Sequence, residues 1–212
     1  MNNPAVLISD DKALVFIHVP KTGGSSVSAA LEPWCPPQER GRLSAWLRPL
    51  GLPRNYRRFK FRRHDPLALV ERIMPAQRFS QFFKFAFVRN PWDRLVSEYN
   101  SVLRLPDHRR HRRVRALGGF KAYLHHEAPS VLASQRRLLV DSSGRIGADF
   151  VGRFERLEQD FASVCERLGI DAALPHLNRH EHDDYRSYYD DESRELVRAQ
   201  WSEDVVAFDY EF

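Results

Sequence analysis

Residues 16–26 of this 212-residue chain read Phe16-Ile17-His18-Val19-Pro20-Lys21-Thr22-Gly23-Gly24-Ser25-Ser26. The apolar run from Leu14 to Val19 predicts a strand that is buried on both faces. The two consecutive glycines allow a tight turn, after which we expect a short helix from about Val27 to Glu32. A loop that joins a buried strand to a helix N-terminus, and that also carries Lys21 and three hydroxyl groups, favours a phosphate-like anion.

Two further junctions between an extended segment and a helix lie in the first half of the chain. The run Phe59–Phe61 predicts a second extended segment, which leads to His64 and then to a helix start at Asp65-Pro66. The run Phe82–Val88 predicts a third strand that ends at Arg89, followed by a helix start at Asn90-Pro91. Because ligands bind at the carboxyl ends of parallel strands, we expect these junctions to meet in one crevice.

The second half of the chain reads as mostly helical, with one late strand at 150–154. An apolar stripe predicts a helix over 157–168 that stops at Gly169, and a final helix is expected over about 192–207. The pattern predicts an α/β fold with a central, mainly parallel sheet flanked by helices. The length of 212 residues is consistent with a single domain over 1–212.

The loop at 20–26 departs from the pattern of nucleoside triphosphatases. There the lysine follows the last glycine and is itself followed by Ser or Thr, which binds magnesium. Here Lys21 precedes the glycines, and the strand that could supply an acidic metal ligand ends in Arg89 instead. The residues therefore predict a nucleotide site that works without magnesium.

Two segments in this order resemble sulfotransferases. Residues 16–26 resemble the loop that binds the 5′-phosphosulfate, and residues 87–99 (Phe-Val-Arg-Asn-Pro-Trp-Asp-Arg-Leu-Val-Ser-Glu-Tyr) resemble the 3′-phosphate motif. The segments at 151–155 and 183–189 are also similar to the carbohydrate sulfotransferase group, in particular to its short bacterial members. The resemblance covers most of the chain.

The resemblance implies a three-layer, P-loop-like fold and a donor, 3′-phosphoadenosine 5′-phosphosulfate (PAPS), used without a metal. It places the 3′-phosphate on Arg89 and Ser97. A loop that closes over the nucleotide is expected to touch it through Tyr185 or Arg186. The resemblance assigns the 5′-phosphosulfate to Lys21, Thr22, Gly23, Gly24, Ser25 and Ser26, with Lys21 also neutralising charge on the leaving phosphate.

His64 is the predicted general base. A sugar hydroxyl must lose its proton during transfer, and histidine has the ordinary pKa nearest to the working range. Among the nine histidines, His64 alone lies at an inferred strand end before a well-capped helix. By position it also resembles the histidine that follows the second strand in this sulfotransferase group. Asp65 and Glu98 are the alternative bases. A purely structural role of His64, as part of the basic segment with Arg62 and Arg63 or in capping the helix that begins at Asp65, is left open.

The charge composition limits the classes of molecule that the protein is expected to bind. The chain has 33 Lys and Arg against 28 Asp and Glu, a formal charge of +5, and most of the cations are Arg, which suits sulfate, phosphate and carboxylate. The basic run Arg104–Arg115 is either a solvated face or a groove for an acidic glycan acceptor. We expect a carbohydrate or another hydroxyl-bearing acceptor, and no nucleic acid.

The N-terminal sequence shows no secretory signal, and the longest apolar run is too short to span a bilayer, so the expected location is cytoplasmic. Cys35 and Cys165 are then expected to be free thiols. Two other functions stay open on the sequence alone. One is a small P-loop kinase or nucleotide hydrolase, which would require magnesium, and the other is a non-catalytic basic module that binds an anionic polymer.

Overall fold

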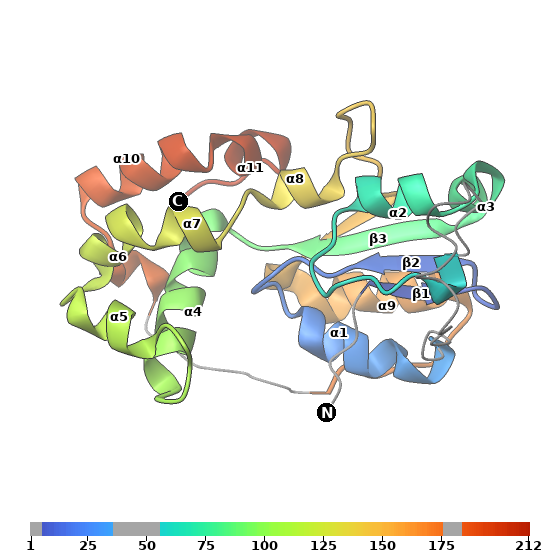
Figure 1. Ribbon diagram of the computed structural model, residues 1–212, viewed down its shortest axis with the longest axis horizontal. Coiled ribbons are helices and arrows are strands. Elements are labelled where there is room, and N and C mark those ends of the chain that lie inside the picture. Colours follow the sequence, from blue (N-terminus) through green and yellow to red (C-terminus); the bar gives the residue numbers. More distant parts are fainter. Residues whose placement is uncertain (1–5, 36–55, 176–183) are drawn as a thin grey trace, which may run out of the picture.

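The computed structural model describes residues 6–35, 56–175 and 184–212. Its centre is a four-stranded sheet in the order β1-β2-β3-β4 (Figure 1). The strands are β1 Leu7–Ser9, β2 Leu14–Ile17, β3 Phe83–Val88 and β4 Phe150–Arg153. β1 is antiparallel to β2, whereas β2, β3 and β4 are mutually parallel, so the expected mainly parallel sheet is confirmed.

Helices cover both faces of this sheet because its strands are apolar on both sides. Side chains at alternate positions of β2 and β3, among them Val15 and Ala86, join the larger core with α2 (Leu67–Ile73). The intervening positions, including Phe16 and Phe85, pack with α1 (Gly24–Leu31) and α9 (Leu157–Leu168). Figure 1 shows α2 on one side of the sheet and α1 with α9 on the other.

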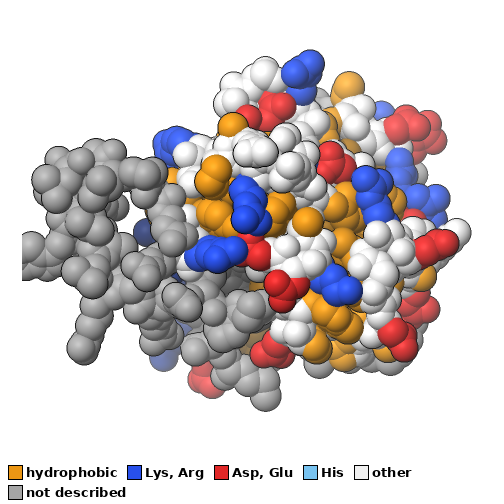
Figure 2. Space-filling model, turned by 90° about the vertical axis from the view of Figure 1, so that its right-hand side faces the viewer, with side chains coloured by type: hydrophobic (Ala, Val, Ile, Leu, Met, Phe, Trp, Pro, Cys, Tyr) orange, Lys and Arg blue, Asp and Glu red, His pale blue; other side chains and the backbone are white. Residues whose placement is uncertain are grey.

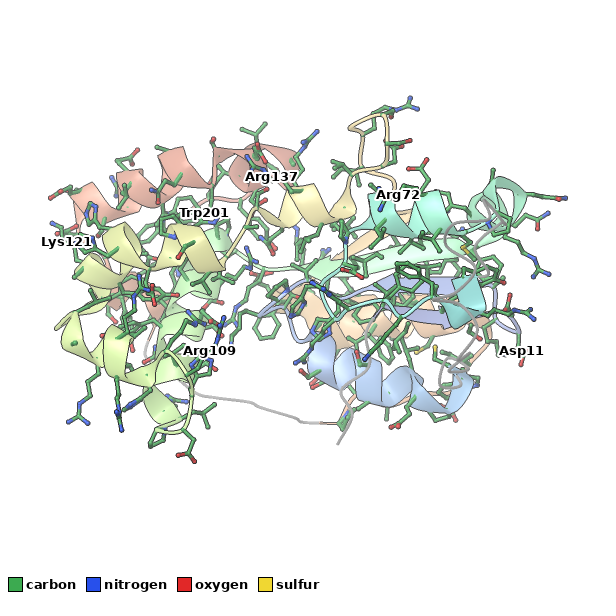
Figure 3. The ribbon with its side chains drawn as sticks, in the orientation of Figure 1. Asp11, Arg72, Arg109, Lys121, Arg137 and Trp201 are labelled. Carbon is green, nitrogen blue, oxygen red and sulfur yellow. The ribbon has the colours of Figure 1, made fainter. Side chains whose placement is uncertain are left out.

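Apart from α3, which directly precedes β3 at its amino end, the remaining helices gather at the carboxyl ends of the parallel strands (Figure 1). Trp201 lies inside this helical half, where its indole N–H donates to the Leu132 carbonyl, and Lys121 lies at its outer end (Figure 3). The long helix α4 leaves β3 directly and connects the two halves. The helices outside the sheet layers are α3 Ala76–Gln81, α4 Pro91–Arg104, α5 His111–Ala116, α6 Phe120–His126, α7 Ala128–Val131, α8 Gln135–Leu139, α10 Asp191–Gln200 and α11 Ser202–Ala207.

The prediction of an extended strand at 59–61 is wrong. β2 has β3 on one side and the unpredicted short strand β1 on the other, so no free edge remains beside it. The segment instead forms a 3-10 turn at Tyr56–Arg58 and then an irregular stretch with Phe61 buried. A single backbone bond, from Val6 N–H to the Arg62 carbonyl, ties this stretch to the start of β1.

Three helix boundaries also differ from the prediction. α1 begins at Gly24, three residues earlier than expected. Asp65 does not cap α2, because its carboxylate accepts the Arg62 N–H and Pro66 is the N-cap residue. The final helix is divided into α10 and α11 at Trp201. The C-terminal stop of α9 at Gly169 is confirmed, with that glycine in the left-handed conformation at φ 58°.

Cys35 and Cys165 are both buried and both free, as expected. Burial raises the pKa of the Cys35 thiol to about 12, so it stays protonated. In the part of the chain that the structure describes, no helix is long and apolar enough to cross a membrane.

Candidate active site

The loop after β2 is shaped by its backbone. Gly23 is the N-cap residue of α1, with φ 76° and no side-chain cap, so the first N–H groups of the helix stay open to a ligand. A Cβ at Gly23 would lie 2.6 Å from Leu157 Cδ2, and one at Gly24 would overlap the His18 ring. Lys21 adopts φ 69°, a left-handed conformation that costs energy for a non-glycine residue. The two glycines are therefore required by close packing beneath the loop.

The Lys21 side chain lies among other cations. Its Nζ is 3.8 Å from Glu98 Oε2, and the side chain is 23% exposed. Burial lowers the pKa of Lys21; the carboxylate of Glu98 opposes this shift, and the charges of Arg89, Arg63 and Arg110 add to it. A site with several converging cations and partial burial favours an anionic ligand.

The hydroxyl groups of the loop have different roles. Thr22 is buried and its Oγ1 donates to the Val19 carbonyl at 3.0 Å, so this hydroxyl proton is already used inside the loop. Ser25 Oγ accepts from Arg63 Nη2 at 2.6 Å and keeps its own proton for a ligand. Ser26 is buried in the first turn of α1. The Thr22 hydroxyl is therefore engaged within the loop, whereas the hydroxyl of Ser25 can still donate to a ligand.

Arg63 is a further residue of the candidate site, which the sequence marks only as one of the two arginines that precede His64. Besides its bond to Ser25, its Nε donates to His18 Nδ1 at 3.3 Å. Its position next to His64 was the available signal, because a residue beside a site histidine can reach the same loop. Arg63 links the loop at residues 20–26, called the donor loop from here on, to the segment that carries His64.

Arg89 lies at the carboxyl end of β3 and is held on several sides. Its Nε and Nη2 donate to the two carboxylate oxygens of Asp93, at 2.7 and 2.9 Å, and its guanidinium lies 4.0 Å from the centre of the Phe154 ring. Nη1 donates to the Lys21 carbonyl at 3.4 Å, which joins Arg89 to the donor loop. The backbone of Arg89 exchanges two hydrogen bonds with the side chain of Gln135, a residue that no sequence motif marks.

Ser97 lies two turns into α4, where it is half-buried and its hydroxyl has no hydrogen bond to any residue that the structure describes. Arg94, on the same helix, is fully buried. It donates to the carbonyls of Pro20 and Ala133, both at 3.0 Å, and lies 3.8 Å from Asp204. Arg94 therefore fastens the donor loop to the helical half of the molecule.

His64 lies beside the donor loop although its segment is not a strand. Its Nδ1 is 2.8 Å from the His18 carbonyl, and the two imidazole rings meet edge to face at 5.0 Å. Partial burial lowers the pKa of His64. The bond to His18 and the charge of Glu98 oppose this shift, whereas Arg63 and Arg94 reinforce it. The outer part of His64 stays exposed to solvent.

The other two candidate bases are already engaged. Both oxygens of Glu98 have cationic partners, Lys21 and Arg110. The Asp65 carboxylate accepts the N–H of Arg62 in a local turn. Of the three candidates, His64 has the more available basic atom.

A cavity of about 530 Å³ opens at the carboxyl ends of β3 and β4, next to Arg89. Tyr185 and Arg186 reach it from a 3-10 turn, with the Arg186 guanidinium 4.6 Å from the centre of the Tyr185 ring. Asn90 fixes the C-terminal segment here, because its side chain donates to the Glu211 carbonyl at 2.7 Å. The cavity is lined by Asn90, Asp93, Arg153, Glu155, Tyr185, Arg186, Asp209, Tyr210 and Glu211.

A family model described as the sulfotransferase family matches residues 4–211, which is nearly the whole chain. The chain belongs to the sulfotransferase family. It is therefore an enzyme that transfers a sulfuryl group to an acceptor. No curated protein matches this sulfotransferase at a significant level.

The candidate site of this sulfotransferase is assembled from distant parts of the chain. The donor loop, His64 and Arg89 meet at the carboxyl ends of β2 and β3, as the sequence predicted, while Tyr185 and Arg186 lie at the neighbouring cavity. The described residues contain no group of three side chains that could hold a metal ion. His180 and His182, two closely spaced histidines for which the sequence offers no third metal ligand, lie outside those residues.

Proposed function

We propose that this sulfotransferase moves the sulfuryl group of PAPS to a hydroxyl group of a carbohydrate, in line and without a metal. The proposal rests on one observation, the convergence of Lys21, Arg63 and Arg89 on an uncapped helix N-terminus beside His64. This arrangement suits a donor with anionic groups at both ends and an acceptor that must lose a proton. The parallel sheet, the Gly-rich loop and the flanking helices fit a P-loop-like fold that forms one domain.

The donor is expected to lie along the edge of the sheet. Lys21, the backbone at Thr22–Gly24, and the side chains of Ser25 and Ser26 would hold the 5′-phosphosulfate. Arg89 and Ser97 would bind the 3′-phosphate; the fork of Arg89 is fixed by Asp93, which leaves the Nη1 edge to face the loop. The cavity beside Arg89 has the size and the stacked Tyr185–Arg186 pair that suit the nucleoside end.

The proton of the acceptor hydroxyl would move to His64. The Nδ1–H of His64 is bonded to a carbonyl, so the neutral ring has its lone pair on Nε2. The acceptor oxygen forms its bond to sulfur while the sulfur–oxygen bond to the 5′-phosphate breaks. The electron pair of the broken bond stays on the phosphate oxygen, where Lys21 neutralises it.

The basic run Arg104–Arg115 supports an acidic acceptor. Five of its arginines are exposed, namely Arg104, Arg109, Arg112, Arg113 and Arg115. They lie in the helical half, between the end of α4 and the end of α5 (Figure 1). At the opposite end of the molecule, cationic and anionic side chains are interspersed (Figure 2). Because electrostatic attraction raises the local concentration of an anionic substrate, this patch favours a carboxylated or sulfated glycan over a neutral one.

Adenosine 3′,5′-bisphosphate, the nucleotide that remains after transfer, tests the proposal directly. We expect it to bind in a calorimetric titration with a submillimolar dissociation constant, unchanged by excess EDTA. AMP, which lacks the 3′-phosphate, should bind more weakly. Absence of binding, or a requirement for magnesium, would contradict the proposed donor and favour a kinase or hydrolase site.

A further inference from the structure

The segment 209–212 closes one side of the cavity next to Arg89. Asp209, Tyr210 and Glu211 are three of the residues that line this cavity, together with side chains from β4, α4 and the 3-10 turn at Tyr185–Tyr188. Asp209 adopts φ 50°, a left-handed conformation that costs energy for a residue other than glycine. Such a conformation persists only where the surrounding contacts hold the backbone, and residues 210–212 supply these contacts.

The first two of these residues are anchored to different strands of the sheet. The Tyr210 hydroxyl donates to Glu155 at 3.0 Å, and the Arg153 guanidinium of β4 lies 4.7 Å from the centre of the Tyr210 ring. The Glu211 carbonyl accepts from the side chain of Asn90, which follows β3, at 2.7 Å. The segment is therefore fixed to the chain at the carboxyl ends of both β3 and β4.

Phe212 connects this anchored segment to the 3-10 turn that carries Tyr185 and Arg186. Its ring meets three aromatic rings edge to face, with centres 5.5 to 5.7 Å apart, namely those of Trp92, Tyr185 and Tyr189. The Arg186 guanidinium lies 5.8 Å from the centre of the Phe212 ring and 4.6 Å from that of Tyr185. Because edge-to-face packing sets the direction of a ring as well as its distance, Phe212 orients the Tyr185 ring.

The two ends of the 3-10 turn are held differently. At its far end the Tyr189 hydroxyl donates to the Trp92 carbonyl at 2.9 Å, a bond that does not involve Phe212. At the cavity, Tyr185 is half-buried, and the bond from the Asn90 side chain to its hydroxyl is 3.5 Å long, at the limit for a hydrogen bond. The Tyr185 ring therefore relies on Phe212 for its orientation.

We propose that Phe212 is a positioning residue of the nucleotide site, which holds the Tyr185 ring and the Arg186 guanidinium against the base. This inference rests on the proposed donor and on the placement of its nucleoside end in this cavity. A planar base stacks on an aromatic ring or a guanidinium plane, and it binds more tightly where that partner is already held in place. Phe212 is not among the residues that line the cavity, so it acts through Tyr185 and Arg186.

A ligand without a base isolates this role. We expect Phe212→Ala to raise the dissociation constant of adenosine 3′,5′-bisphosphate by about 10-fold in calorimetry. The abasic analogue 1,4-anhydroribitol 3,5-bisphosphate keeps both phosphates, and its dissociation constant should scarcely change. The KM for PAPS should rise with kcat unchanged, because the lost contact contributes equally before and during transfer. Phe79→Ala is the matched control, since it removes another half-buried phenylalanine, on α3, and it should leave both constants unchanged.

Two further variants complete the test. Phe212→Tyr keeps the ring and should restore the affinity for adenosine 3′,5′-bisphosphate. If Phe212→Ala proves unfolded in a thermal melt, Phe212→Leu removes the ring but keeps apolar volume, and it should show the same selective loss. An equal loss for the bisphosphate and the abasic analogue, or no loss in a folded variant, would overturn the inference. Failure of the parent protein to bind the bisphosphate would instead refute the proposed donor.

Discussion

His64 Nδ1 lies 2.8 Å from the backbone carbonyl of His18, and a carbonyl can only accept a hydrogen bond. The proton of neutral His64 is therefore on Nδ1, and its lone pair is on Nε2. The same His18 accepts from Arg63 through its own ring and packs beneath Gly24 of the donor loop. One buried residue thus orients the proposed base relative to the donor loop.

Replacement of His64 by Ala should lower turnover by about 10²–10⁴, the usual contribution of general-base catalysis. The dissociation constant of adenosine 3′,5′-bisphosphate should stay nearly the same, because His64 makes none of the proposed nucleotide contacts. Steady-state kinetics with saturating PAPS, together with calorimetry, would measure both quantities. His126→Ala, which removes an exposed histidine from α6, is the control, and full activity of His64→Ala would assign the proton transfer to another group.

The pH dependence of the reaction follows from the lowered pKa of His64. The base form has lost its proton, so activity is retained as the pH falls through 6.5 and is lost only below it. The groups that set this pKa include His18, Arg63, Arg94 and Glu98. Since the charge of Arg63 holds the pKa down, Arg63→Gln should move the acidic limb of kcat/KM upward. An acidic limb at or above pH 6.5 in the parent enzyme would contradict this description.

Replacement of Arg89 by Ala should selectively weaken the binding of the 3′-phosphorylated nucleotide. Loss of a charge-assisted hydrogen bond costs about 1.5–3 kcal/mol, whereas binding of AMP should scarcely change. Arg156→Ala is a matched control, because it also breaks an Arg–Asp pair four residues apart, with the arginine exposed at the N-cap of α9. An equal loss for both nucleotides would mean that Arg89 only supports the loop. Ser97→Ala should act in the same direction, more weakly.

The sheet and the donor loop were predictable because their signals are local. A continuous apolar strand, a pair of glycines and an Asn-Pro helix start each determine the backbone within a few residues. The failure at 59–61 has a non-local cause. That segment has strand-like residues, but β1 already occupies the edge of β2, and Leu7–Ser9 alone is too short to be predicted as a strand.

The composition of the site was predictable only in part, for the same reason. Lys21, His64 and Arg89 follow recognisable segments, and the structure brings them together. Gln135 reaches Arg89 from a helix 46 positions along the chain, and no local pattern marks it. Likewise, the sequence does not distinguish Arg110, whose side chain points inward, from the five exposed arginines of the same run. The helix is too short for its pattern of residues to show which face is buried.

Replacement of Lys21 by Ala should lower turnover more than it weakens nucleotide binding. The charge on the leaving phosphate builds up only during transfer, so the interaction with Lys21 is stronger in the transition state. The loss of one such interaction is typically worth about 3 kcal/mol, or 10²–10³ in rate. Single-turnover kinetics at saturating PAPS would measure it, with Lys60→Ala, at an exposed position, as the control. Near-parental turnover would show that Lys21 is not needed for the chemical step.

Buried His18 should make the protein sensitive to acid. Its pKa is lowered to about 3, chiefly by burial and further by the charges of Arg63 and His64, whereas in the unfolded chain it is near 6.5. Between these two pKa values, His18 is protonated in the unfolded state and neutral in the folded state. The stabilisation is therefore present above pH 6.5 and is lost as the pH falls toward 3, by about 2 kcal/mol at pH 5.

His18→Asn tests this, since the asparagine oxygen can still accept from Arg63 but does not titrate. Urea unfolding of both proteins at pH 7.5 and pH 5 gives two differences in the free energy of unfolding. We expect the difference to be smaller in the variant by about 2 kcal/mol, whatever the cost of the altered packing at pH 7.5. Equal differences would mean that His18 becomes protonated in the folded protein. A positive charge on His18 would then be tolerated next to Arg63, the donor loop and His64.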